Sequence, residues 1–193
     1  MAHCESNIET EVKLRVPDDP ALTRALLGQH RYRITRPRVF ESNTVYDTAG
    51  HSLRQRGELI RLRRAGESAV LTFKSADLPG RHKRREELET EVADAAVIEA
   101  ILNRLGLDAR FRYDKYRTEY QRDSGEGTVM LDETPIGVFL ELEGRPEWID
   151  AAAGELGFQE SAYILCSYGA LYFEHCWRHT IEPRDMVFPQ TAP

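Results

Sequence analysis

The segment IETEVKLRV, residues 8–16, alternates charged and apolar side chains with almost no break. Glu9, Glu11 and Lys13 fall on one side of an extended chain, and mostly apolar residues fall on the other. Because successive side chains of a strand point to opposite faces, the pattern predicts a strand with one charged face. Such a face either contacts bulk water or borders an interior that needs charges.

The same alternation recurs along the chain. Taken alone, each segment of this kind is typical of a half-exposed strand whose charged face is solvated. Five of them in one chain, with carboxylates two residues apart in three of the five, favour a shared charged surface instead. The segments are 8–16, 59–64, 85–92, 112–120 and 138–144.

Helical patterns accompany these strands and indicate where the apolar faces are buried. Amphipathic helices have to cover their apolar sides, and the apolar faces of the strands are the natural partner. The charged strand faces would then point inward, so we predict an α+β fold in which about eight strands close a barrel and helices pack outside it. Further strands are expected at 44–48, 69–74 and 128–132, and helices at 18–29, 94–105, 147–156 and 161–176.

A charged barrel interior is incompatible with a dry core, because unpaired buried ions cost several kcal/mol each. It suits a water-filled tunnel that holds a ligand. Guanidinium groups match phosphate oxygens, and carboxylates without His or Cys suit a hard cation such as Mg²⁺ or Mn²⁺. We therefore interpret the interior as a polyphosphate site with a carboxylate-bound metal. The acidic set is Glu9, Glu11, Glu87, Glu89, Glu141 and Glu143, and the basic set is Lys13, Arg61, Arg63, Lys74, Lys115 and Arg117.

Length, composition and charge narrow the domain organisation, the partners and the location that we expect. The 193 residues suit one domain, which we expect over 1–176, with a C-terminal tail over 177–193. A net charge of −6 argues against a nucleic-acid partner. The chain has no apolar run of about 18 residues, which argues against a membrane span. Three cysteines without CxxC spacing and no apolar leader at the N-terminus fit a cytoplasmic protein.

The residues resemble the CYTH domain family, also called triphosphate tunnel metalloenzymes. The first shared motif is ExExK, at residues 9–13. ExExK alone is a weak signal, but further segments resemble the family in the same order up to residue 172, and the ordered set is specific. These segments read VYDT, LRQRGELIRLRR, LTFK, REELE, FRYDKYRTEY, LDETPIGVFLELEG and SYGALY.

The resemblance implies an eight-stranded antiparallel tunnel that binds a triphosphate and one or two divalent cations, Mg²⁺ or Mn²⁺. It implies metal ligation by Glu9, Glu11, Glu141 and Glu143, with Asp132 as a further candidate on the metal side. It implies phosphate binding by Lys13, Arg61, Arg63, Lys74, Lys115 and Arg117. The catalytic set that it implies is Glu9, Glu11, Lys13, Glu87 and Glu89.

Three activities follow from the resemblance, and the residues do not decide among them. The late segments are most similar to the class IV adenylyl cyclase branch, which converts ATP to cyclic AMP and pyrophosphate. The alternative is an inorganic triphosphatase or a thiamine triphosphatase, acting on tripolyphosphate or thiamine triphosphate. A module that binds nucleotide or polyphosphate without turnover is disfavoured, because a pure anion binder gains nothing from carboxylates. A homodimer through a barrel edge or the last helix is left open.

Overall fold

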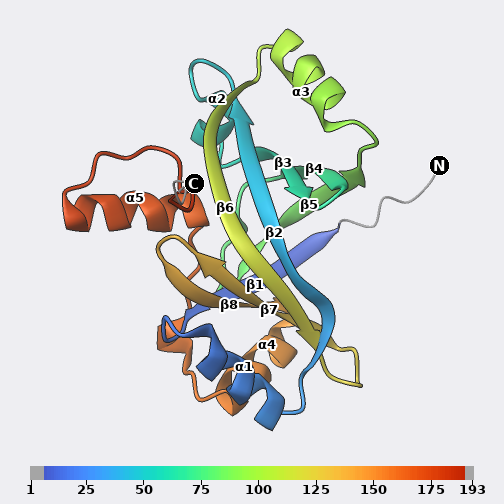
Figure 1. The fold of residues 1–193 in the computed structure, drawn as a ribbon, viewed down its shortest axis with the longest axis vertical. Coiled ribbons are helices and arrows are strands. Elements are labelled where there is room, and N and C mark those ends of the chain that lie inside the picture. Colours follow the sequence, from blue (N-terminus) through green and yellow to red (C-terminus); the bar gives the residue numbers. More distant parts are fainter. Residues whose placement is uncertain (1–6, 190–193) are drawn as a thin grey trace.

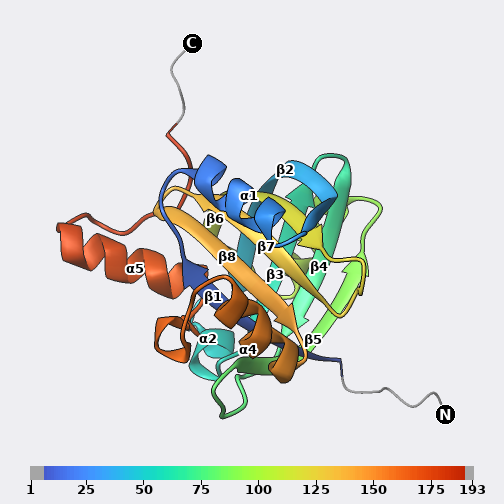
Figure 2. The same cartoon turned by 90° about the horizontal axis from the view of Figure 1, so that it is seen from below.

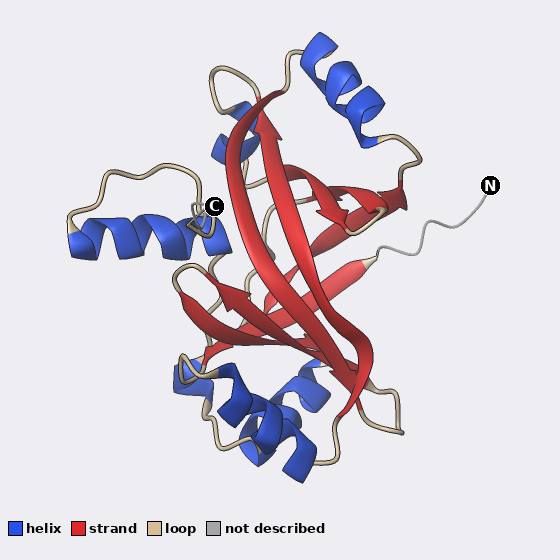
Figure 3. Cartoon of the chain, in the orientation of Figure 1, coloured by secondary structure: helices blue, strands red, loops and turns tan. Residues whose placement is uncertain are grey.

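The structure, a computed structural model, describes residues 7–189 and closes eight strands into one barrel (Figure 1). The strands follow the order β1-β5-β4-β3-β2-β6-β7-β8, and every pairing between neighbours is antiparallel. The helices lie outside the barrel, which confirms the predicted fold class (Figure 3). The elements are β1 (Ile8–Arg15), α1 (Pro20–Gln29), β2 (Arg33–Asp47), α2 (Ser52–Gln55), β3 (Leu59–Ala65), β4 (Ser68–Lys74), β5 (Lys83–Glu91), α3 (Ala95–Arg104), β6 (Asp108–Gln121), β7 (Gly127–Thr134), β8 (Gly137–Gly144), α4 (Pro146–Glu155), the 3₁₀ turn η1 (Glu160–Ala162) and α5 (Tyr168–His179).

The main apolar core lies outside the barrel wall rather than within it. Leu14 of β1, Leu131 of β7 and Leu140 of β8 are fully buried and belong to one cluster. Leu27 of α1 and Ile149 of α4 complete the cluster from the helix side. Figure 2 shows α1 lying against β7, and α4 against β1 and β8. The strands therefore bury their apolar faces outward, and their charged faces are left to the interior.

A second core holds α3 to the opposite side of the barrel. Tyr46 of β2, Leu62 of β3 and Leu102 of α3 form a buried cluster there. The Tyr46 hydroxyl also donates a hydrogen bond of 2.8 Å to Glu99 of α3. The helix begins after Asp94, whose carboxylate accepts from the backbone, as its sequence predicts.

The predicted helix over 161–176 is wrong at its start. Backbone hydrogen bonds pair Ile164 with Lys13 of β1, at 2.9 and 3.0 Å, and this pairing requires an extended chain. The helix α5 begins only at Tyr168, where the Ser167 hydroxyl caps it, and it continues to His179. A tertiary contact thus displaces the helix start by about two turns.

Part of the predicted C-terminal tail, 177–193, is ordered against the barrel. The chain returns from α5 to β6, where the Met186 backbone exchanges hydrogen bonds with Arg112 and Asp114. The Met186 side chain is buried in a cluster with residues of β6, β8 and α5. The predicted tail's last residues, 190–193, and the predicted domain's first residues, 1–6, lie outside the described residues. Among those that are described, no helix is long and apolar enough to cross a membrane.

The pair β2–β6 is longer than the sequence indicates. Strands were expected at 44–48 and 112–120, whereas β2 spans Arg33–Asp47 and β6 spans Asp108–Gln121. The two strands run side by side over the height of the molecule (Figure 1). Their register shifts at three points, so no single alternation runs through β2.

Truncating the outer core should cost much more than truncating an exposed leucine. We expect Leu140→Ala to lower the free energy of unfolding by about 2–5 kcal/mol, because the side chain is fully buried. Leu105→Ala removes the same atoms from a side chain that is 71% exposed. This variant should change the free energy of unfolding by about 0.5 kcal/mol or less. Urea denaturation of both variants measures the difference. Equal losses would contradict a core outside the barrel.

Candidate functional site

A cavity of about 540 Å³ opens into the barrel and is lined by charged side chains from β1, β3, β4, β5, β6 and β8. Twelve of the thirteen site residues expected from the sequence line it. The alternation of each strand explains this placement, since the opposite side chains are in the outer cores. These twelve are Glu9, Glu11, Lys13, Arg61, Arg63, Lys74, Glu87, Glu89, Lys115, Arg117, Glu141 and Glu143.

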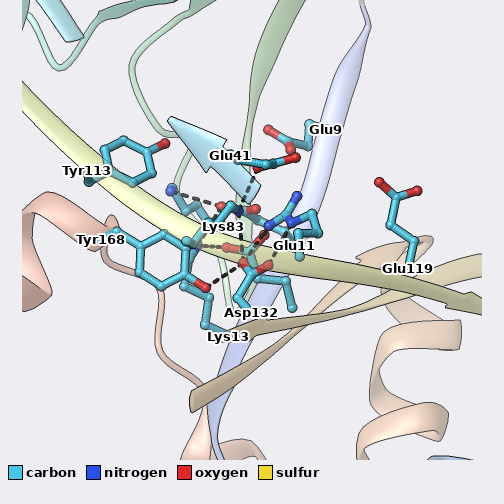
Figure 4. A network of polar contacts seen from close by, with 12 residues as sticks. Glu9, Glu11, Lys13, Glu41, Lys83, Tyr113, Glu119, Asp132 and Tyr168 are labelled. Carbon is cyan, nitrogen blue, oxygen red and sulfur yellow. Dashed lines mark hydrogen bonds and ion pairs between the residues drawn. The ribbon is translucent and has the colours of Figure 1, made fainter. Parts of the chain in front are cut away.

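Ion pairs connect cations and carboxylates across neighbouring strands (Figure 4). Glu11 contacts Lys13 at 3.0 Å and Lys83 at 2.9 Å. Lys13 also lies 3.2 Å from Glu141, which in turn pairs with Arg117. Burial alone would lower the pKa of Lys13, but Glu11 and Glu141 raise it above its ordinary value. The chain of contacts keeps buried charges compensated across the barrel.

Lys74 of β4 lies between two carboxylates, one on the adjacent strand β5 and one on β1, the next strand along. Its ammonium group is 2.7 Å from Glu9 and 2.7 Å from Glu87. Burial and the hydrogen bond with Glu9 raise the pKa of Glu87 to about 8, despite the opposing effect of Lys74. Glu87 is therefore a carboxyl group that can exchange a proton near neutral pH. Beyond it, Glu89 accepts from Arg61 at 3.2 Å.

Asp132, the thirteenth expected residue, lies behind the cavity wall. Its carboxylate is fully buried and accepts from Lys115 at 2.9 Å, from Arg117 at 2.7 and 2.6 Å, and from the Tyr168 hydroxyl at 2.7 Å. Both oxygens are thus already engaged. This geometry does not fit the expected metal-side role of Asp132; it fits a residue that positions two cations.

Two buried polar residues of β2 are not predicted from the sequence as part of the site. Glu41 is fully buried, 3.7 Å from Lys115, and Asn43 next to it on the same face is fully buried too. Burial would raise the pKa of Glu41, yet the positive charges of Lys115 and Arg117 lower it to about 2. The Asn43 amide has no hydrogen-bond partner among the described residues. The predicted strand at 44–48 began too late to include either residue.

Lys83 and Arg85 also line the cavity, on the same face of β5 as Glu87 and before it in the sequence. The predicted strand at 85–92 began too late to include Lys83. With these additions, every strand of the barrel contributes a charge, and the interior has eight cations and eight carboxylates. The cations are Lys13, Arg61, Arg63, Lys74, Lys83, Arg85, Lys115 and Arg117, and the carboxylates are Glu9, Glu11, Glu41, Glu87, Glu89, Asp132, Glu141 and Glu143.

One of these eight carboxylates has no cation at ion-pair distance among the described residues. Glu143 has no ion-pair partner among residues 7–189. Burial, together with the negative charges of Glu9 and Glu11, raises the pKa of Glu143 to about 7. The described residues contain no preformed group of three side chains at metal-binding distance. Even so, the carboxylates of Glu143, Glu9 and Glu11 repel one another, and oxygen donors of this kind fit a hard divalent cation in their chemistry.

The comparisons with solved structures show the same fold. A protein of Vibrio parahaemolyticus, named as a candidate adenylate cyclase, has a TM-score of 0.73 at 20% identity, covering 86% of this chain and 98% of its own. The PH1819 protein of Pyrococcus horikoshii has a TM-score of 0.70 at 23% identity, covering 86% and 99%. HpAC1 of Hippeastrum, a candidate adenylyl cyclase described as having a dominant triphosphatase activity, has a TM-score of 0.63 at 19% identity, covering 91% and 97%.

A search of curated proteins finds no match to this chain. The family model for the CYTH domain does match, over residues 7–161. That range begins just before β1 and includes all eight strands. With the fold and most of its length in agreement, this chain belongs to the CYTH domain family.

Proposed function

We propose that the protein is a divalent-metal-dependent enzyme that acts on a triphosphate held in the barrel. The observation that carries the proposal is the convergence of eight cations on a cavity that also contains an uncompensated carboxylate, Glu143. Phosphate oxygens match guanidinium and ammonium donors, and a carboxylate group with excess negative charge matches a metal. The cavity volume of about 540 Å³ and the net charge of −6 suit a small molecule better than a nucleic acid.

The two kinds of charge have separate roles in this proposal. Mg²⁺ or Mn²⁺ would be held on the carboxylate side, and when bound it would neutralise charge that develops on the phosphates. The oxygens of the phosphate chain would replace the internal carboxylates as partners of these cations. The proposed metal ligands are Glu9, Glu11, Glu141 and Glu143, and the proposed phosphate ligands are Lys13, Arg61, Arg63, Lys74, Lys115 and Arg117.

The reaction we propose is the cyclisation of ATP. The ribose 3′-hydroxyl attacks the α-phosphorus, the bond to the β-phosphate breaks, and pyrophosphate leaves. Glu87 lines the cavity and its pKa of about 8 suits a group that accepts the hydroxyl proton. Lys74, 2.7 Å from Glu87, orients that carboxylate.

Hydrolysis of a triphosphate is the second candidate. Here water attacks the terminal phosphorus, and the same cations hold the chain. The description of HpAC1, a relative in fold, as having a dominant triphosphatase activity favours this alternative. The cytoplasmic location stays a prediction from the sequence, and the homodimer stays open.

The reaction products decide between the two candidates. With Mn²⁺ and ATP, we expect cyclic AMP and pyrophosphate in equal amounts, measured by chromatography. Orthophosphate from ATP or from tripolyphosphate would instead identify a triphosphatase. Tight binding of both compounds without any product would contradict the proposal of an enzyme.

Glu9→Gln should abolish metal-dependent turnover, because it removes a charged oxygen from the proposed metal site and the partner of Lys74. We expect kcat to fall by more than the roughly 10- to 100-fold that outer-sphere partners of a metal cost. Glu86→Gln is the matched control, since Glu86 is the neighbour of Glu87 on β5 and does not line the cavity. Its kcat should equal that of the wild type. Unimpaired turnover in Glu9→Gln would remove this residue from the metal site.

Glu143→Gln should stabilise the metal-free protein at high pH. The folded state raises the pKa of Glu143 from 4.5 to about 7, so its favourable contribution is present at low pH and is lost as pH rises through 7. We expect the variant to exceed the wild type by about 2 kcal/mol in unfolding free energy at pH 8, and by less at pH 5. Denaturation in EDTA at both values measures this. A difference that does not change with pH would contradict the assignment.

A further inference from the structure

The cavity is not charged along its whole length; one end is lined by aromatic rings. Phe173 of α5 is 37% exposed at this end, and Phe111 of β6 lies 5.9 Å from it between ring centroids. Tyr113 follows at 6.0 Å from Phe111, nearly parallel to it. The Tyr113 hydroxyl accepts from Arg61 at 3.3 Å. A row of rings therefore leads from the solvent to the first phosphate-binding arginine.

A cation completes this aromatic end. The guanidinium group of Arg54 lies 5.4 Å from the centre of the Phe173 ring and lines the same cavity. Arg54 has no ion-pair partner among the described residues. The backbone of Arg54 is held in place, because the Asp47 carboxylate accepts hydrogen bonds from the backbone amides of Leu53 and Arg54, at 2.9 and 3.0 Å. These bonds fix the short helix α2.

The rings add nothing to the binding of a bare phosphate chain. They suit a planar ring that can stack on them, and stacking of this kind tolerates any neutral base. The cavity of about 540 Å³ is within the roughly 300–1,000 Å³ typical of small-molecule pockets. The unpaired charge of Arg54 repels a cationic heterocycle such as the thiazolium ring of thiamine.

We propose that Phe111, Phe173 and Arg54 bind the neutral aromatic base of a nucleoside triphosphate, whose phosphate chain reaches the charged interior. This inference rests on the proposed function and specifies the substrate class of the same site. It assigns recognition of the organic group to β6, α5 and α2 and separates it from recognition of the phosphates.

Binding of two matched probes tests the proposal. One is an ATP analogue and the other a tripolyphosphate analogue, each with methylene groups in place of both P–O–P bridges so that neither reaction can break it. Calorimetry with Mn²⁺ should show that Phe173→Ala and Phe111→Ala weaken the ATP analogue by about 5- to 150-fold, the value of one stacked base. The affinity for the tripolyphosphate analogue should not change.

Trp177→Ala provides the matched control on α5, because Trp177 is 81% exposed and does not line the cavity. It should bind both probes as the wild type does. Phe173→Leu and Phe111→Leu keep apolar bulk without a ring and replace the alanine variants if these fail to fold. They should show the same selective loss.

Each contrary outcome has a distinct meaning. If the ring variants weaken both probes equally, or neither, the rings are structural and this proposal fails, while the proposed triphosphate site stands. If thiamine triphosphate binds more tightly than the ATP analogue and depends on Phe173, the neutral-base assignment is wrong. If the wild type binds neither probe, the proposed function fails as well.

Discussion

Compensation of charge inside a closed barrel is the constraint on which this structure depends. Eight cations and eight carboxylates face one interior, and each would be costly if left without a partner. Neighbouring strands supply the partners, as where Glu11 of β1 pairs with Lys83 of β5. Because the interior is committed to charge, the apolar faces have to be buried on the outside, and α1, α3 and α4 are needed to cover them.

The same pairing of charges allows the interior cations to exchange their carboxylate partners for those of a ligand. A cation that already has a carboxylate at hydrogen-bond distance can accept a phosphate oxygen instead, and the released carboxylate then needs a positive charge of its own. A metal bound together with the phosphates meets that need, so the two ligands are energetically linked. Glu143 already lacks an ion-pair partner among the described residues, and burial with the negative charges of Glu9 and Glu11 raises its pKa to about 7. If Glu143 binds metal as we propose, its charge favours binding at the expense of the stability of the metal-free protein.

Regular alternation made the barrel and most of the interior predictable. In β1 and β8 the interior charges alternate with outward residues that are mostly apolar, and the same pattern in six strands places twelve site residues. Where alternation is interrupted, prediction fails. Glu41 was missed because the predicted strand at 44–48 did not include the first part of β2, whose register along β6 is irregular before Val39. Asp132 could be assigned to the interior from the sequence, but its hydrogen-bond partners could not be predicted. One of them, Tyr168, belongs to α5, which is distant from Asp132 in sequence. The start of α5 depends on backbone pairing between Ile164 and Lys13, which no local signal encodes.

The dependence of the barrel interior on ion pairs also determines which part of the cavity can vary to set substrate specificity. A change to a paired interior charge disturbs its partner, so most of the charged interior tolerates little variation without loss of stability. The aromatic end is free of that restriction, because Phe173 and Arg54 come from α5 and α2, which lie outside the barrel wall (Figure 1). Substituting them alters the shape and charge of the opening and leaves the interior ion pairs intact. In the functions that we propose, ion pairs constrain the charged interior that binds the phosphates, and the aromatic end that binds the organic group can vary more freely.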